Sequence, residues 1–145
     1  MKPAPYFAVL SVVLFLSAFN SHATEWYVAP SGNDMAAGTN WDTAKESIQA
    51  AIDAASSNDT VWVSNGVYTT GGRVVFGAMT NRVAITKPIT VQSINGLGDT
   101  FIRGSGPLGN SAVRCVYVGS NAILSGFVLT NGATLKTDDD RERGG

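Results

Sequence analysis

The sequence Val61-Trp62-Val63-Ser64 runs directly into Asn65-Gly66, and an apolar stretch before an Asn-Gly pair occurs three times in the chain. The other two copies are Ile89-Thr90-Val91-Gln92-Ser93-Ile94 before Asn95-Gly96, and Phe127-Val128-Leu129-Thr130 before Asn131-Gly132. Asn and Gly adopt positive φ more readily than other residues, so each pair predicts a sharp corner after a strand. The corners lie 30 and 36 residues apart, which is the spacing of a supersecondary repeat. Strands and corners that recur without helices predict a coil of stacked strands.

From Asp59 onward the sequence is a series of short apolar stretches separated by Gly, Asn, Ser and Pro. These stretches predict strands at residues 60–64, 74–76, 83–86, 89–94, 100–103, 113–118 and 123–129. An antiparallel β-sandwich is the alternative, in which Asn65-Gly66 forms a type I′ hairpin turn before Val67-Tyr68. That return stretch is short, because Thr69-Thr70-Gly71-Gly72 ends it. We therefore favour an all-β solenoid of parallel strands.

One stretch has helical periodicity. Its apolar residues recur at helical spacing and form one stripe, consisting of Ala44, Ile48, Ala51, Ile52 and Ala55. Thr43 is a good N-cap, and Glu46 three residues later completes a capping box. Gln49 falls on another face, and the polar residues 56–59 end the helix. The sequence thus predicts an amphipathic helix after a short strand at residues 26–28 and a turn-rich loop.

The first residues have the pattern of an export signal. Lys2 supplies a positive charge before residues 7–19, which are almost wholly apolar. Ser21 and Ala23 are small residues at the two positions that a signal peptidase reads. As a helix, residues 7–19 would cover about 20 Å of a hydrocarbon core roughly 30 Å thick, which disfavours a membrane anchor. We predict cleavage after Ala23, a mature chain that starts at Thr24, and a secreted, extracellular or cell-surface location.

These patterns divide the chain into three parts. Residues 1–23 form the predicted signal peptide, residues 24–58 a strand, loop and helix, and residues 59–145 the first turns of the coil. The sequence closes with a charged and then glycine-rich run at residues 136–145, and no second capping helix is predicted there. We expect the coil to continue in a longer protein, and a small complete module is the alternative.

The charge and the few reactive residues exclude several classes of function. The chain has 10 basic and 11 acidic residues, and loss of Lys2 leaves a net charge near −2. This charge excludes nucleic-acid binding through phosphate neutralisation. The single histidine, His22, leaves with the signal peptide, which excludes a Ser-His or Cys-His nucleophile pair and a His-ligated zinc site. The single cysteine, Cys115, shares a strand face with Val113 and Tyr117, and we interpret it as a small buried hydrophobe. A disulfide to a cysteine beyond residue 145 is the alternative.

Several segments together resemble the start of secreted bacterial right-handed parallel β-helix proteins with a pectin-lyase-like fold. They are Trp26-Tyr27-Val28-Ala29-Pro30-Ser31-Gly32-Asn33-Asp34, Gly38-Thr39 with Trp41, the helix of residues 48–55, Asp59-Thr60-Val61-Trp62-Val63, Lys87-Pro88-Ile89-Thr90-Val91-Gln92-Ser93 and Leu124-Ser125-Gly126-Phe127-Val128-Leu129-Thr130-Asn131-Gly132-Ala133-Thr134. The resemblance covers residues 26–145 and implies a right-handed coil with the helix as its N-terminal cap. It is specific for architecture and weak for function, because the same fold serves lyases, hydrolases and adhesins.

The helix has a physical role in such a coil. An open first turn would expose roughly 400 Å² of apolar surface and forgo about 10 kcal/mol. A helix laid across it removes this exposure, as terminal caps do in other solenoids. We therefore predict that Ile48 and Ile52 face the first turn near Val61 and Val63.

The visible sequence contains no convincing catalytic, cofactor or metal site. The resemblance implies carboxylates that hold Ca²⁺ and basic residues that act on uronates, for which several residues are weak candidates: Asp138, Asp139 and Asp140 beside Arg141 and Arg143, Asp34 and Asp42, and Arg73, Arg103 and Arg114. We interpret the acidic run as a solvated loop, and Asp34 and Asp42 as acceptors for local backbone N–H groups. Four aromatic residues are candidates to stack on sugar rings: Trp26, Trp41, Trp62 and Tyr68. The side chain of Trp62 points opposite to those of Val61 and Val63. For Trp26 and Trp41 we favour packing against the core or the cap.

Three functions follow as hypotheses. We prefer a monomeric β-helix scaffold that presents a surface for polysaccharide or cell-surface glycan. The alternatives are a polysaccharide lyase or glycoside hydrolase with catalytic turns downstream, and the passenger domain of an autotransporter-like adhesin. No integral membrane segment is expected after signal cleavage.

Overall fold

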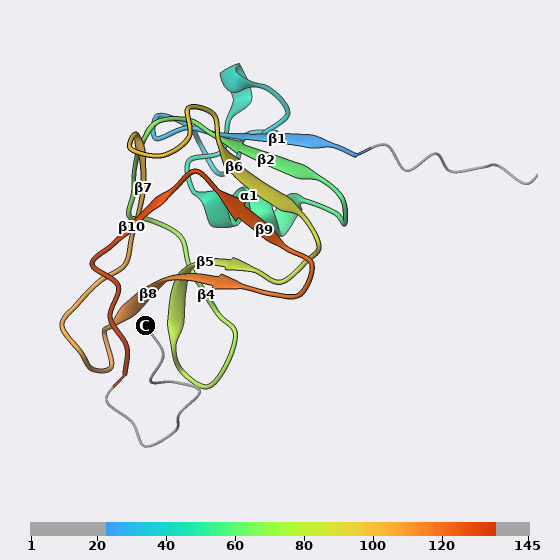
Figure 1. Cartoon of the computed structure of the whole chain (residues 1–145). Helices are drawn as coiled ribbons and strands as arrows, with labels where there is room; N and C mark the ends of the chain where they lie inside the picture. Colours follow the sequence, from blue (N-terminus) through green and yellow to red (C-terminus); the bar gives the residue numbers. More distant parts are fainter. Residues whose placement is uncertain (1–22, 136–145) are drawn as a thin grey trace, which may run out of the picture.

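The computed structural model describes residues 23–135, and it shows strands that wind as a coil of about three turns (Figure 1). The strands stack into three sheets. The first sheet contains β1 (Glu25–Val28), β2 (Thr60–Val63), β6 (Thr90–Ser93) and β9 (Ile123–Ser125) in that order. The second contains β3 (Gly66–Tyr68), β7 (Thr100–Arg103) and β10 (Val128–Thr130), and the third β4 (Arg73–Val74), β5 (Thr80–Ile85) and β8 (Val113–Val118).

All neighbouring strands are parallel except β4 and β5. In the first sheet Thr60 is in register with Thr90, and Thr90 with Ile123, so successive turns are 30 and 33 residues long. The chain passes once through each sheet per turn, from β2 through β3 to β5 and then from β6 through β7 to β8. The chain is therefore a parallel β-solenoid, which confirms the predicted class. The antiparallel sandwich is wrong, because β2 and β3 belong to different sheets and form no hairpin.

Two of the three Asn-Gly corners stack as predicted. Asn95 Nδ2 donates a hydrogen bond of 2.9 Å to Asn65 Oδ1 on the turn below. The third pair lies at a different corner, since Asn131 follows β10 in the second sheet. Gly126, with a φ of 82°, occupies the place above Gly96, and it breaks the predicted strand at residues 123–129 into β9 and β10. This change of corner explains the unequal spacing of the pairs.

The helix begins later than predicted. The α-helix α1 spans Ile48–Ala54, and its N-cap is Ser47, whose side chain accepts from Ala50 N. The predicted cap Thr43 instead ends a 3-10 helix, η1 (Trp41–Thr43). Between the two helices, Lys45 forms a parallel bridge with Val28, donating its N–H to Tyr27 O at 2.8 Å. This pairing extends the backbone and prevents the predicted capping box.

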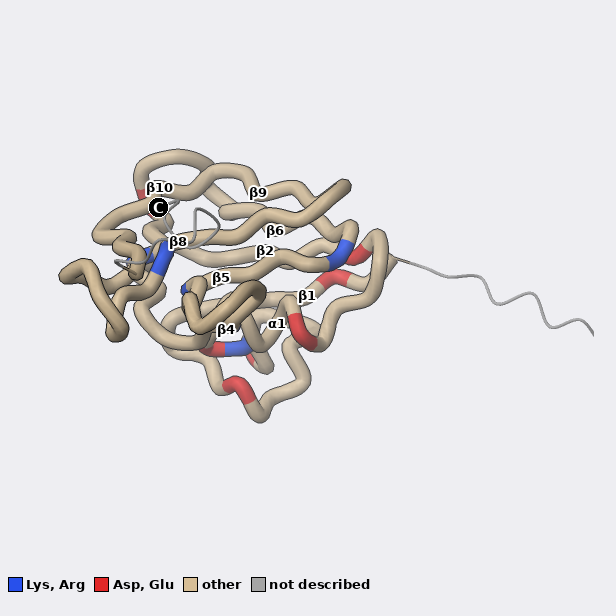
Figure 2. The backbone as a smooth tube through the Cα atoms, turned by 90° about the horizontal axis from the view of Figure 1, so that it is seen from below, with Lys and Arg blue, Asp and Glu red and all other residues tan. Residues whose placement is uncertain are grey.

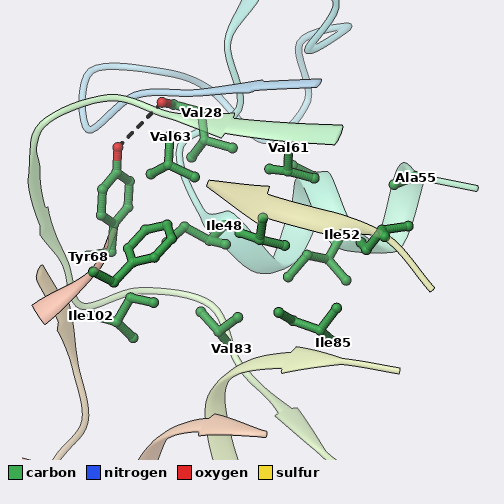
Figure 3. Packing of buried hydrophobic residues seen from close by; sticks show 14 residues of the cluster. Val28, Ile48, Ile52, Ala55, Val61, Val63, Tyr68, Val83, Ile85 and Ile102 are labelled. Carbon is green, nitrogen blue, oxygen red and sulfur yellow. Dashed lines mark hydrogen bonds between the residues drawn. The ribbon is translucent and has the colours of Figure 1, made fainter. Parts of the chain in front are cut away.

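The apolar stripe of α1 covers the first turn of the coil, as predicted (Figure 3). Ile48 and Ile52 are each 1% exposed, and they belong to one buried cluster with Val61 and Val63. The cluster continues through the interior, where Tyr68, Val83, Ile85, Ile89, Val91 and Ile102 are also buried. The helix thus closes the N-terminal end of the core.

Polar side chains fix the helix to the sheets at both ends. Gln49, predicted to lie on a polar face, is buried: its Oε1 accepts from Ala84 N at 2.8 Å and its Nε2 donates to Ala84 O at 3.4 Å. Its amide therefore pairs with β5 as a neighbouring strand would. At the other end, Lys87 Nζ donates to the carbonyl oxygens of Ile52, Asp53 and Ala55, which a helix leaves unpaired.

Candidate functional site

A row of outward-facing side chains crosses the first sheet parallel to the axis of the coil. The register places Tyr27 beside Trp62, Trp62 beside Gln92, and Gln92 beside Ser125. Val61 and Val63 on either side of Trp62 are fully buried, so the indole points outward, and it is partly exposed. Neighbouring strands lie about 4.8 Å apart, which brings the two aromatic side chains together on one face. We call Glu25, Tyr27, Trp41 and Trp62 the aromatic face.

Glu25 fixes the orientation of both rings. It lies two residues before Tyr27 and so projects from the same side of β1. Tyr27 OH donates to Glu25 Oε2 at 2.9 Å, and Trp62 Nε1 donates to Glu25 Oε1 at 3.2 Å. The hydrogen bond to Glu25, together with partial burial and the negative charge of Glu25, raises the pKa of Tyr27. The phenol therefore stays neutral as a hydrogen-bond donor through neutral pH.

Trp41 extends the aromatic face from the side. It lies in η1, and its ring meets that of Tyr27 edge-on, with the centroids 4.8 Å apart and the planes at 72°. We predicted core or cap packing for this residue, but its side chain is 44% exposed. The loop before α1 thus contributes a tryptophan to the surface, because Lys45 pairs with Val28 and holds the loop against β1.

The other two candidate aromatic residues are not available to a ligand. Trp26 is half-buried against the core, and its Nε1 donates to Asp59 Oδ2 at 3.0 Å. Tyr68 is 3% exposed, and its hydroxyl donates to Ser64 O at 2.9 Å. The same hydroxyl lies 3.4 Å from Val28 O (Figure 3). Burial raises the pKa of Tyr68 to about 12. Packing is therefore the role of both residues.

The three candidate arginines do not meet in one groove. Arg73 pairs with Asp53 at 3.0 Å beside the third sheet. Arg103 ends β7 in the second sheet and lines a shallow groove of about 300 Å³ with Val67 and Phe101. Arg114 lies in β8, and its Nη2 donates to Thr134 Oγ1 at 3.2 Å. Over the described tube, charged residues are few and scattered (Figure 2).

The acidic candidates do not converge either. Asp34 Oδ1 accepts from Glu46 N and Ser47 N at 2.9 and 2.7 Å, and its Oδ2 accepts from Ser47 Oγ at 2.7 Å. It therefore holds the loop to the start of α1, as an acceptor of backbone N–H groups. Asp42 is exposed on η1. Within residues 23–135 no cluster of three or more potential metal ligands occurs, and Asp138, Asp139 and Asp140 lie outside the described residues.

The Asp34 contacts give a testable prediction. Asp34→Ala leaves two backbone N–H groups and the Ser47 hydroxyl without their acceptor, and we expect it to lower the free energy of unfolding by about 1–2 kcal/mol. Asp42→Ala is the matched control and should change it by less than about 0.5 kcal/mol. Thermal unfolding with and without Ca²⁺ checks both points. Equal stability of the two variants, or stabilisation of the parent by Ca²⁺ that Asp34→Ala abolishes, would contradict this role.

A hollow of about 560 Å³ lies beside β8, which is the last strand of the third sheet within residues 23–135. It is lined by Asn81, Arg114, Cys115, Val116, Tyr117, Val118, Leu129 and Gly132. Cys115 is half-buried there, packs against the core and donates its Sγ–H to Thr130 O at 3.2 Å. Cys115 therefore packs as a small hydrophobe, as predicted, but it is only partly buried.

Comparisons of the chain with protein-family models, with curated proteins and with solved structures each gave no match. The fold alone therefore defines its class, a parallel β-solenoid with a capping helix. Within residues 23–135 no helix combines the length and the apolar composition needed to cross a membrane.

Proposed function

We propose that this chain is a secreted or cell-surface β-helix scaffold of the pectin-lyase-like kind whose aromatic face binds a neutral polysaccharide. The observation that carries the proposal is the hydrogen bonding of Tyr27 OH and Trp62 Nε1 to the two oxygens of one carboxylate, Glu25. Aromatic rings that are held in place by their polar ends lose little conformational entropy when a sugar ring packs on them.

The row of outward-facing side chains that continues from the aromatic face favours a linear ligand. Tyr27, Trp62, Gln92 and Ser125 form a row that runs across successive turns of the coil. Rings at its start offer apolar contact to the C–H groups of a sugar, and the amide and hydroxyl further along offer hydrogen bonds to its hydroxyl groups. A polysaccharide chain would thus lie along the axis of the solenoid.

The charge of the face favours a neutral ligand over a uronate. Its one ionisable group of low ordinary pKa is Glu25, and none of the outward residues of this row is a lysine or arginine. A polyuronate would bring its carboxylates close to the carboxylate of Glu25 without a compensating cation, and the like charges would repel each other. The three candidate arginines supply no such cation, because they lie on other sheets: Arg73, Arg103 and Arg114.

Affinity electrophoresis and tryptophan fluorescence test the proposal with hydroxyethylcellulose and galactomannan as neutral polymers and polygalacturonate as the acidic one. We expect binding to a neutral polymer only. Trp62→Ala should weaken it roughly 5- to 30-fold, since an aromatic contact of this kind contributes about 1–2 kcal/mol. Phe76→Ala is the matched control, because Phe76 is an exposed aromatic residue that contacts Tyr117 instead.

Two outcomes would contradict the proposal. One is equal loss of binding in Trp62→Ala and Phe76→Ala, and the other is preferential binding of polygalacturonate by the parent. Glu25→Gln keeps the size of the side chain, but its amide has one acceptor oxygen and can hold only one of the two rings. We expect this variant to bind the neutral polymer more weakly than the parent.

A further inference from the structure

A buried carboxylate lies where the described chain begins. Asp59 stands between α1 and β2 and is 4% exposed. Its Oδ2 accepts from Ser56 N at 2.7 Å and from Trp26 Nε1 at 3.0 Å, and its Oδ1 accepts from the backbone nitrogen of Thr24 at 2.8 Å. Burial raises the pKa of Asp59, but these hydrogen bonds and the charge of Lys87 outweigh it, so that the pKa lies below its ordinary value. The carboxylate is therefore ionised at neutral pH.

No cation balances this buried charge at short range within residues 23–135. The ion pair found there joins Arg73 and Asp53. Lys87 stabilises the negative charge of Asp59 electrostatically but forms no hydrogen bond with it, because its Nζ donates to carbonyl oxygens at the end of α1. Glu25, the acidic residue next to Thr24 in the sequence, engages Tyr27 and Trp62 on the outer face.

The nitrogen that contacts Asp59 Oδ1 is also the nitrogen that the predicted signal-peptide cleavage would release. Ser21 and Ala23 mark the bond between Ala23 and Thr24 for hydrolysis. Thr24 is held in place from its other side as well, because its carbonyl oxygen accepts from Thr60 N at 3.0 Å. Asp59 and β2 therefore hold Thr24 in place from both sides.

We propose that cleavage between Ala23 and Thr24 creates an ion pair between the new α-ammonium group of Thr24 and the buried carboxylate of Asp59. A signal peptidase adds water across the amide bond: Ala23 leaves as a carboxylate, and the Thr24 nitrogen takes up protons to become –NH₃⁺. In the uncleaved chain only the acceptor of this hydrogen bond is charged, whereas after cleavage the donor is charged as well, and the contact becomes an ion pair, which is stronger. Processing thereby stabilises the first turn of the coil.

The pH dependence of this stabilisation follows from the direction in which the pKa of the α-amino group shifts. An α-amino group has an ordinary pKa of about 7.7–8.0, and Asp59 raises it in the folded chain. The added stability is fully present below the pKa that the α-amino group has in the unfolded chain. It is lost as the pH rises through the higher pKa of this group in the folded chain. On the acid side, the same stability is lost as the pH falls through the lowered pKa of Asp59.

Two chains test the proposal, each released from a fusion that leaves no extra residue. One begins at Thr24, and the other retains residues 21–23 with His22→Ala so that no imidazole titrates. We expect the first to melt about 3–8 °C higher at pH 6–7, and the difference to vanish above about pH 9. Asp59→Asn in both chains should abolish the difference. An equal melting temperature of the two parents across this range would overturn the proposal.

A second readout does not depend on whether Asp59→Asn folds. Competitive labelling of the α-amino group against pH should give a raised pKa in the chain that begins at Thr24 and an ordinary value in the extended chain. Export of the full-length chain from a bacterial host, followed by intact-mass measurement, should give a product that begins at Thr24. An ordinary α-amino pKa in the first chain, or a mature protein that begins elsewhere or keeps its first residues, would contradict the inference.

Discussion

Ile52→Asp is expected to lower the free energy of unfolding by about 3–5 kcal/mol, which is a large part of the stability of a domain of this size. Ile52 is 1% exposed and packs in the cluster that contains Val61 and Val63 (Figure 3). Asp in its place removes the apolar contact and introduces a charge without a partner. Urea unfolding followed by circular dichroism measures the effect.

Ala54→Asp is the matched control for this variant, because Ala54 is an exposed residue of the same helix. Its cost should stay below about 1 kcal/mol, from the unfavourable position of a negative charge near the C-terminus of a helix. If Ile52→Asp unfolds at the same urea concentration as Ala54→Asp, α1 does not cap the coil. The aromatic face should fail together with the cap, since β1 and β2 carry its main residues and also contact α1.

Gly104→Ala is expected to lower the free energy of unfolding by about 3 kcal/mol. Gly104 is buried just after β7. A Cβ atom there would press against the carbonyl oxygen of Val113, and it would lie 2.7 Å from Gly132 Cα and 3.0 Å from Asn131 O. All three atoms belong to the backbone, so no side-chain rotation relieves the contact.

The effect of this substitution should be confined to the last turns of the coil. Gly104 N donates to Thr130 O at 2.9 Å, which ties the end of β7 to β10. Gly106→Ala is the matched control, because a Cβ atom there meets only Ala133 Cβ at 3.8 Å. Hydrogen exchange should show faster opening of β10 and β8 in Gly104→Ala than in Gly106→Ala. Equal exchange and equal stability would show that the backbone can adjust at Gly104.

Much of the candidate site was within reach of the sequence. The alternation around Trp62 placed its side chain opposite to those of Val61 and Val63, and the structure agrees. The role of Tyr27 and Glu25 was missed, although Glu25-Trp26-Tyr27-Val28 and Thr60-Val61-Trp62-Val63 align in a register that repeats the same alternation. Placing β1 beside β2 would have revealed the aromatic face. The position of Trp41 could not be found in this way, because its loop is fixed by pairing between Lys45 and Val28.

The sequence by itself determined the kind of fold, since its alternation and corner residues permit a strand to turn only at certain places, and it determined which face of α1 is apolar. The tertiary structure decided where α1 begins, because Lys45 pairs with β1 and Asp34 engages the N–H groups of Glu46 and Ser47. It also buried Gln49, whose amide replaces a missing strand beside Ala84. Local patterns depend on neighbours a few residues away, whereas these contacts join residues that are distant in the sequence and have no local signature.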